Sequence, residues 1–285
     1  MSGAFFNDEA RKQALLKDIR ELGPVHAAWL TPAVLEADAG ALAADQGLHP
    51  TVGHILPLLG VYGHEAGAAA FYEAAIEAIP VGADGADIVQ RWFLASWAHP
   101  EYGFKAALAE TPLLEPAQAI IDLVEESRSA KIAPPRWRQA RAALAAALDV
   151  SGLDAELADP VLSMAWDLDR TPAASADVVN AWAGPIMMKA HQSGDWTDAD
   201  GERYGELFAD FSQRALAQID QPRQGDQEQY ARYKAILEDL WKAAPDTEAL
   251  WRRNQVRQSR ADAIVAAWRD EARRLFVDCA RAAAG

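Results

Sequence analysis

The 285-residue sequence contains one cysteine, Cys279, and few of the β-branched residues that favour strands. A lone cysteine excludes an internal disulfide, which is typical of proteins from a reducing compartment. We therefore expect a cytoplasmic protein. About a fifth of the chain is alanine, the residue that favours helices most strongly. The composition accordingly predicts an all-α fold with almost no sheet.

Positive charge is also scarce. The chain has 27 lysines and arginines against 42 aspartates and glutamates, which gives a formal net charge of −15 at pH 7. A charge of this sign and size opposes non-specific binding to nucleic acid and to anionic lipid. We expect the partner to be another protein. On grounds of net charge its surface should be basic, whereas nucleic acid is an unfavourable partner.

Long apolar runs are missing as well. The longest stretch without a charged side chain spans residues 46–64, and it contains four glycines, two prolines and three histidines. Such a stretch is a poor membrane helix, so we expect no membrane contact. The first residues carry acids where a secretion signal needs basic side chains, and we also expect no leader peptide.

Helix start and stop signals recur along the whole chain. Capping residues or prolines precede most runs of apolar residues at helical spacing, and glycine or proline follows them. These signals predict a multi-helix bundle of about ten to twelve helices, with breaks at Pro57 and at Gly184–Pro185. The last predicted helix, about 247–282, is long and basic.

The sharpest break in the pattern is the pair Pro134–Pro135. One interpretation divides the chain there into two helical subdomains. The first is a bundle of residues 1–132, and the second is a bundle of residues 133–285 closed by the long basic helix. The alternative is a single domain, because two prolines can equally begin the next helix.

The uncharged stretch holds half of the six histidines, which makes it a candidate site. Imidazole nitrogens bind transition metals, so His49, His54 and His64 are candidate metal ligands. Their spacing matches no specific metal motif, since His49 and His54 are five positions apart and His64–Glu65 lacks the second histidine of H-E-x-x-H. The alternative is that these histidines bond to backbone groups at loops and helix ends. The sequence therefore implies no cofactor.

The candidate catalytic residues lie in or beside this stretch, or directly after the most apolar predicted helix. They are His54, His64, Glu65 and His99. His99 has Glu101 close by in the sequence, and a histidine held by a carboxylate would have the orientation that a general base needs. The alternative places His99 at a helix C-terminus, where the helix dipole favours a histidine.

The segment from Trp251 onward reverses the charge of the chain, with eight arginines and four acids. Arg253, Arg257 and Arg260 recur at i, i+4 and i+7, which places them on one stripe of the last predicted helix. Such a stripe can contact nucleic-acid phosphates, but the acidic remainder of the chain opposes that role. We expect the stripe to lie against acidic helices of this protein or of a partner. The three arginines are therefore candidate partner-binding residues.

Other patterns have plain structural interpretations. Thr197 and Asp200 have the spacing of a capping box, and the acids around them fail the calcium-loop pattern at its first and twelfth positions. Asp167 and Asp169 could hold magnesium in a helical enzyme, but no second acidic cluster accompanies them. Most of the ten tryptophans are expected to fill a core that is otherwise built from alanine.

No motif in the sequence is specific enough to name a reaction, and two function classes remain. The first is a non-enzymatic soluble helical module that binds another protein, as a regulator, adaptor or immunity-type inhibitor. The alternative is a helical enzyme, or a small-molecule- or metal-binding protein, with a pocket formed by residues 46–65. The first class needs fewer coincidences and is preferred, while catalysis stays open.

Overall fold

The computed structural model describes residues 3–23, 39–61, 67–153, 155–192, 194–219 and 227–283. Across these ranges it contains thirteen α-helices, eleven of them with seven or more residues, and no strand. The predicted all-α, multi-helix fold is therefore confirmed, with slightly more helices than expected. None of the helices in the described ranges is long and apolar enough to cross a membrane.

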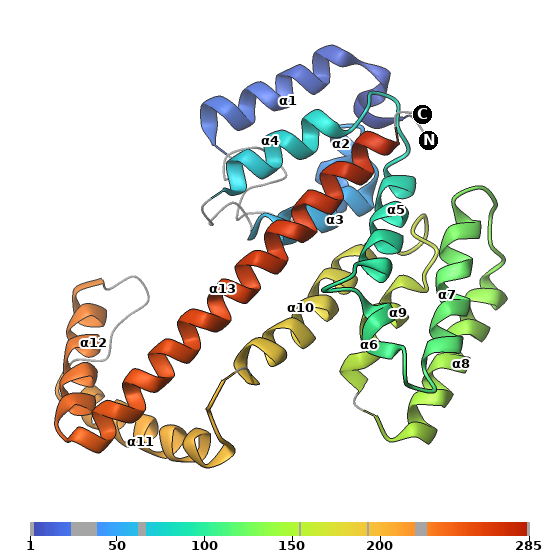
Figure 1. Ribbon diagram of the computed structural model, residues 1–285. Helices are drawn as coiled ribbons and strands as arrows, with labels where there is room; N and C mark the ends of the chain where they lie inside the picture. The colour runs from blue at the N-terminus through green and yellow to red at the C-terminus, as the bar shows by residue number, and fades with distance from the viewer. Residues whose placement is uncertain are drawn as a thin grey trace. The chain divides into compact units, whose positions relative to one another are not determined.

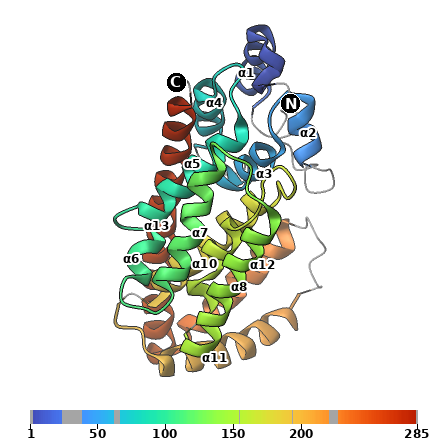
Figure 2. The same cartoon turned by 90° about the vertical axis from the view of Figure 1, so that its right-hand side faces the viewer.

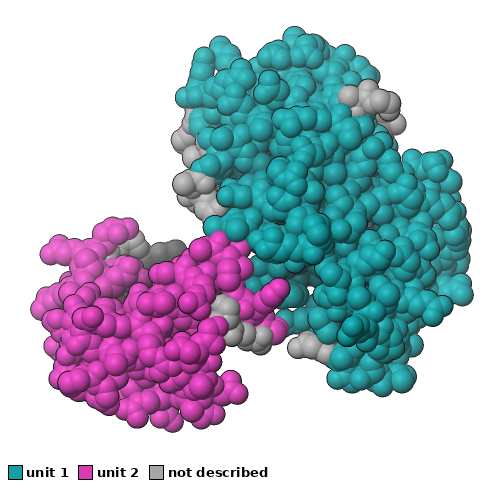
Figure 3. All heavy atoms as spheres, in the orientation of Figure 1, with its two compact units in different colours: residues 1–186, 266–285 teal, residues 187–265 magenta. Residues whose placement is uncertain are grey.

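The chain folds into two compact units, which Figure 3 distinguishes by colour. Unit 1 comprises residues 1–186 and 266–285, and unit 2 comprises residues 187–265. Two long helices, α10 (Ala174–Gln192) and α13 (Pro245–Ala282), each begin in one unit and end in the other. Unit 1 is therefore completed by a C-terminal segment that lies far away in the sequence, whereas unit 2 is one continuous stretch of chain.

The pair Pro134–Pro135 begins a helix, α8 (Pro134–Ser151). Proline suits the first turn of a helix because its missing N–H would have no partner there. Residues on both sides of this pair belong to unit 1. The subdomains 1–132 and 133–285 thus differ from the compact units, and that division of the chain stays a prediction.

Unit 1 contains most of the helices. Before α10 they are, in chain order, η1 (Ala4–Asn7), α1 (Glu9–Leu22), α2 (Ala39–Asp45), α3 (Pro50–Leu59), α4 (Ala68–Ala78), α5 (Gly85–Ala98), α6 (Phe104–Leu108), α7 (Leu114–Ser127), α8, η4 (Ala155–Leu157) and α9 (Asp159–Met164). Figures 1 and 2 show α1 beside α4 and α7 beside α8. Helix α3 packs against α2 and α5, so the described part of the uncharged stretch, residues 46–61, contributes to the core.

Tryptophans fill the centre of unit 1. The ring of Trp182 in α10 meets Trp92 of α5 and Trp268 of α13 edge-on, with ring centroids 5.5 Å apart in both pairs. The indole N–H of Trp92 donates to the carbonyl of Ala272 (3.0 Å), and that of Trp182 donates to the carbonyl of Tyr102 (2.9 Å). The cluster therefore joins α5, α10 and α13 by both packing and hydrogen bonds.

Two buried cations in unit 1 donate hydrogen bonds to carbonyl groups at the C-terminal ends of helices. Nζ of Lys12 donates to the carbonyls of Glu77 and Ile79 at the end of α4, both at 2.8 Å. Nε of Arg273 donates to the carbonyl of Leu59 at the end of α3, also at 2.8 Å. The last carbonyls of a helix lack intrahelical partners and carry partial negative charge. Both cations satisfy such groups and tie distant helices together.

Two predicted helix breaks are wrong. Helix α3 continues through Pro57, and α10 continues through Gly184–Pro185. A proline inside a helix removes one backbone hydrogen bond and crowds the preceding turn, but packing can hold the helix together around it. The neighbouring side chains of Leu56 and Ile186 are both buried. Tertiary packing thus outweighs the local signal at both positions.

Unit 2 is built from the end of α10, α11 (Asp198–Leu216), α12 (Gln227–Lys242) and the first part of α13. Its core is aromatic. The ring of Tyr204 stacks on Trp241 with centroids 4.9 Å apart, and Phe211 meets the same tryptophan edge-on at 4.9 Å. Because Trp241 is fully buried, it is the centre of this small unit.

Candidate functional site

A cavity in unit 2 brings together the three arginines that the sequence singles out. It has a volume of about 260 Å³ and lies between α13 and the segment that connects α10 to α11. We call it the arginine cavity. Its lining residues are Asp195, Trp196, Arg252, Arg253, Val256, Arg257 and Arg260.

The N-terminus of α11 fixes one edge of the arginine cavity. Thr197 Oγ1 accepts a hydrogen bond from the Asp200 N–H (3.1 Å), and Asp200 Oδ2 accepts one from the Thr197 N–H (3.0 Å). The predicted capping box is therefore confirmed. Arg253 donates from Nη1 and Nη2 to the two carboxylate oxygens of Asp200, at 3.0 and 2.7 Å. This ion pair, with the Thr197 bonds, lowers the pKa of Asp200 to about 2.

The indole ring of Trp196 orients two of the arginines. The guanidinium carbons of Arg253 and Arg257 lie 5.7 and 5.0 Å from the centroid of the ring. Both distances are within the range of cation–π attraction. Nε of Arg257 also donates to the carbonyl of His191 in the last turn of α10, at 2.9 Å. The Arg257 guanidinium is thus held by an aromatic ring and a neutral oxygen.

Arg260 lies against the backbone of Gly194. The φ angle of Gly194 is 114°, a conformation that residues with a side chain rarely adopt. A Cβ atom at this position would also lie 2.7 Å from Nη1 of Arg260. Among the described residues, Arg260 has no hydrogen bond and no ion pair. Its N–H donors therefore remain available to a ligand.

The arginines of the cavity differ in how their charge is balanced. Like Arg253, Arg252 has a carboxylate partner, since its Nη2 lies 2.6 Å from Oε1 of Glu248. Arg257 and Arg260 have no carboxylate partner among the described residues, and we call them the open arginine pair. Guanidinium groups bind carboxylates and phosphates through parallel N–H donors. The cavity can accordingly bind an anion at the open arginine pair.

The arginine cavity offers N–H donors and positive charge. The residues that line the arginine cavity include no cysteine, serine, threonine, histidine or lysine. The hydrogen bond and charge of Asp200, and to a smaller extent the charge of Asp195, raise the pKa of Arg253. Asp195 is the one carboxylate in the lining, and it therefore interacts with an arginine that is already paired with Asp200.

No protein-family model, curated protein or solved structure matches the chain.

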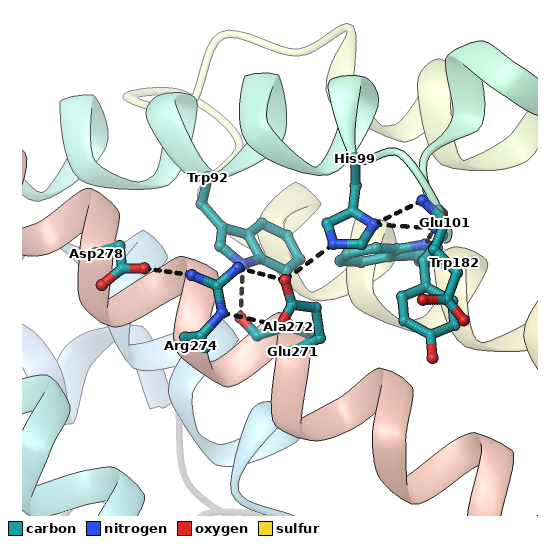
Figure 4. Close-up of polar contacts among 9 residues, drawn as sticks. Trp92, His99, Glu101, Trp182, Glu271, Ala272, Arg274 and Asp278 are labelled. Carbon is teal, nitrogen blue, oxygen red and sulfur yellow. Dashed lines mark hydrogen bonds and ion pairs between the residues drawn. The ribbon is translucent and has the colours of Figure 1, made fainter.

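His99 is the C-terminal capping residue of α5. Its Nδ1 accepts hydrogen bonds from the N–H groups of Glu101 (3.2 Å) and Tyr102 (3.0 Å), so the ring proton lies on Nε2. As Figure 4 shows, Nε2 faces Oε1 of Glu271 in α13 at 2.9 Å. Bonds from Arg274 and from His99 lower the pKa of Glu271 to about 2. Both ring nitrogens are therefore engaged, by backbone N–H groups and by a carboxylate, and the catalytic hypothesis for His99 stays a prediction.

The histidines of the uncharged stretch have separate positions. His49 caps the N-terminus of α3 with Nδ1, and its Nε2 lies 3.4 Å from Oδ1 of Asp169. His54 is half-buried within α3, while His64 and Glu65 lie outside the described residues. Within the described ranges, no three His, Cys, Asp or Glu side chains are placed to hold a metal ion. The metal and catalytic hypotheses that include His64 and Glu65 stay predictions.

Two cavities in unit 1 share Asp84 in their lining, with volumes of about 540 and 270 Å³. His49 lines the larger, and Asp167 and Asp169 line the smaller. Oδ1 of Asp167 accepts a hydrogen bond from the Asp169 N–H (3.1 Å), which is a turn-forming contact. Neither cavity is lined by the other candidate histidines of the described chain. Among the described residues, neither cavity therefore brings His54 and His99 together.

Sequence reasoning found the arginine stripe but missed two residues that complete the site, Trp196 and Gly194. Tryptophan in an alanine-rich chain is expected in the core, and Trp196 instead lies between a turn and the capping residue Thr197. Its position next to a helix cap, outside any apolar helical pattern, is the one signal that could have identified it.

Proposed function

We propose that the protein is a non-enzymatic protein-binding module, and that unit 2 binds an acidic segment of its partner at the arginine cavity. The observation that carries this proposal is the open arginine pair, which lies beside Trp196 and beside Val256, whose side chain is 62% exposed. Arginine and tryptophan are enriched among the residues that supply most of the binding energy at protein interfaces. Side chains that can make cationic contacts and side chains that can make apolar contacts therefore lie side by side at one site.

Exposed apolar side chains on unit 2 support a protein partner over a small ion. Single exposed apolar residues are ordinary on folded proteins, but Val256 lies in the lining of a charged cavity. A partner segment that combines carboxylates with aliphatic side chains would cover both kinds of surface. The large exposed apolar residues in the described part of unit 2 are Met187, Met188, Phe208, Leu216, Tyr230 and Val256.

The proposed contact surface of the partner is acidic, although the net charge of −15 favours a basic protein. Net charge acts at long range, and salt screens it over about 8 Å at physiological ionic strength. Contacts within the cavity are shorter than this distance. Local charge therefore selects the group that binds, whereas net charge chiefly slows the approach of an acidic partner.

A labelled peptide of repeating Glu-Glu-Leu tests the proposal, with full-length protein titrated at low salt and fluorescence anisotropy as the readout. We expect Arg260→Glu to weaken binding by at least about tenfold, because a repulsive charge replaces an attractive one. Arg232→Glu is the matched control, since Arg232 is exposed on α12 and the change in net charge is the same. Equal losses for the two variants, or no binding by the wild type, contradict the proposal.

The alternative function, a helical enzyme or a small-molecule- or metal-binding protein with a pocket at residues 46–65, stays a prediction. It depends on His64 and Glu65, which lie outside the described residues. Stoichiometric metal in protein purified without chelator, lost in His64→Ala without loss of helicity, would support it.

A further inference from the structure

We infer that the acidic segment bound at the arginine cavity carries a phosphoryl group, and that the open arginine pair holds this group. The inference rests on the proposed function, because it specifies which chemical group of the partner is recognised. A phosphorylated serine differs from an ordinary acidic residue in charge and in the number of its acceptor oxygens. Both differences bear on the geometry of this cavity.

The charge of the open arginine pair matches a phosphoryl monoester. The two guanidinium groups carry two positive charges, and phosphoserine carries about −1.5 to −2 near pH 7. One phosphoryl group supplies three acceptor oxygens for the N–H donors of both guanidinium groups, whereas a carboxylate supplies two.

Both arginines also line the same cavity from one helix. Arg257 and Arg260 are three positions apart on α13, which makes them neighbours on one face of the helix. Nε and Nη1 of Arg257 donate to the carbonyl of His191 (2.9 Å) and to Oδ1 of Asn254 (3.4 Å). Those bonds, together with the Trp196 ring, fix the guanidinium and leave Nη2 for the ligand. Arg260 supplies the remaining donors.

The surroundings of the pair favour a compact dianion over a row of carboxylates. Asp195 lines the cavity on the side of Arg253, whose Nη2 donates to the Asp195 carbonyl at 3.1 Å. Arg252 and Arg253 are already paired, so they offer little to additional acids of the partner. Binding energy is therefore concentrated at the open arginine pair.

Three peptides of one acidic sequence, with serine, glutamate or phosphoserine at the central position, test the inference on the full-length protein. We expect the phosphoserine peptide to bind at least about tenfold more tightly than the glutamate peptide. The second pKa of the phosphoryl group is about 6, so lowering the pH from about 7.5 to about 5.5 should weaken only the phosphoserine complex. Equal affinities of the phosphoserine and glutamate peptides overturn the inference but leave the proposed function intact.

Arg260→Lys separates charge from geometry, because lysine keeps the charge but lacks the planar set of donors. We expect this variant to weaken binding of both acidic peptides but to weaken the phosphoserine complex by the larger factor, because the phosphoryl group engages more of the planar N–H donors. Arg232→Lys should change neither affinity. Unchanged phosphoserine preference in Arg260→Lys overturns the assignment to the open arginine pair.

Two further arms identify the source of the phosphoryl group. Inorganic phosphate should displace the phosphoserine peptide only at much higher concentration, since it lacks the flanking contacts. Vesicles containing phosphatidylserine should bind no better than neutral vesicles, and tighter binding to them than to the phosphopeptide overturns the inference. If none of the three peptides binds, the proposed function fails together with the inference.

Discussion

Arg253 and Asp200 form a two-pronged ion pair that joins α13 to the first turn of α11 across 53 positions of sequence. The same carboxylate closes the capping box with Thr197, so one side chain organises both the helix start and the edge of the cavity. Because Asp200 balances the charge of Arg253, the stripe contains one arginine with a carboxylate partner, whereas Arg257 and Arg260 have none among the described residues.

The ion pair should make part of the stability sensitive to acid. The pKa of Asp200 is about 2 in the folded protein, chiefly because Arg253 bonds it, whereas an aspartate in an unfolded chain titrates near about 3.9. Its contribution is therefore complete above about pH 4 and is lost as the pH falls toward 2. In Asp200→Asn this part of the pH dependence should be absent from thermal unfolding followed by circular dichroism.

Asp198→Asn is the control for this experiment. Asp198 is an exposed acid in the same helical turn, so its replacement should leave the pH profile close to that of the wild type. Identical profiles for the wild type and Asp200→Asn would show that the Arg253 contact adds nothing to stability.

Gly194→Ala should impair binding without removing any charge. The positive φ of Gly194 disfavours a side chain, and the added methyl group would displace Nη1 of Arg260. We expect weaker binding of the Glu-Glu-Leu peptide and a destabilisation of about 1 kcal/mol or more. Gly205→Ala is the matched control, because that glycine lies within α11 with open space around it and alanine favours helix there. Wild-type peptide affinity in Gly194→Ala would contradict the account of how Arg260 is positioned.

Two buried tryptophans of unit 1 allow the contribution of one indole hydrogen bond to the free energy of unfolding to be measured. The N–H of Trp92 donates to the carbonyl of Ala272, whereas the N–H of Trp268 has no hydrogen-bond partner among the described residues. Trp92→Phe and Trp268→Phe remove the same atoms from one aromatic cluster. We expect Trp92→Phe to lower the free energy of unfolding by about 1 kcal/mol more than Trp268→Phe. Urea denaturation measures the difference, and a larger loss in Trp268→Phe would contradict it.

The thiol of Cys279 should be inert in the folded protein. Burial, reinforced by the charge of Asp278, raises the pKa of this thiol to about 11, so almost none of it is thiolate near pH 8. We expect negligible reaction with a disulfide reagent near pH 8 and one thiol released on unfolding in denaturant. Rapid modification of the folded protein would show that the C-terminal part of α13 opens readily.

Local signals account for much of the fold. The capping box at Thr197 and the proline start at Pro134 both mark helices where the structure has them, because caps act within one turn. Pro57 and Pro185 show the limit of this reasoning. At both positions the helix is maintained by packing against distant residues, which no local pattern contains.

Only part of the site could be predicted from the sequence, because the rest depends on contacts between residues that lie far apart in the chain. The spacing of Arg253, Arg257 and Arg260 follows from helical periodicity alone, and it correctly groups them on one stripe. Their contacts with Trp196 and Gly194 connect positions about sixty residues apart, and no periodicity relates such positions. His99 is a parallel case, since its partner Glu271 lies 172 positions further along the chain.

The most direct test of the central claim exchanges charges across the proposed interface. It measures the affinities of wild-type protein and Arg260→Glu for the acidic peptide and for a peptide in which lysine replaces its central glutamate. The account predicts that Arg260→Glu weakens binding of the acidic peptide by at least about tenfold but strengthens binding of the lysine peptide. The two opposite changes give a large coupling energy between Arg260 and the central residue of the peptide. If Arg260→Glu changes both affinities alike, as Arg232→Glu should, the arginine cavity is not the binding site.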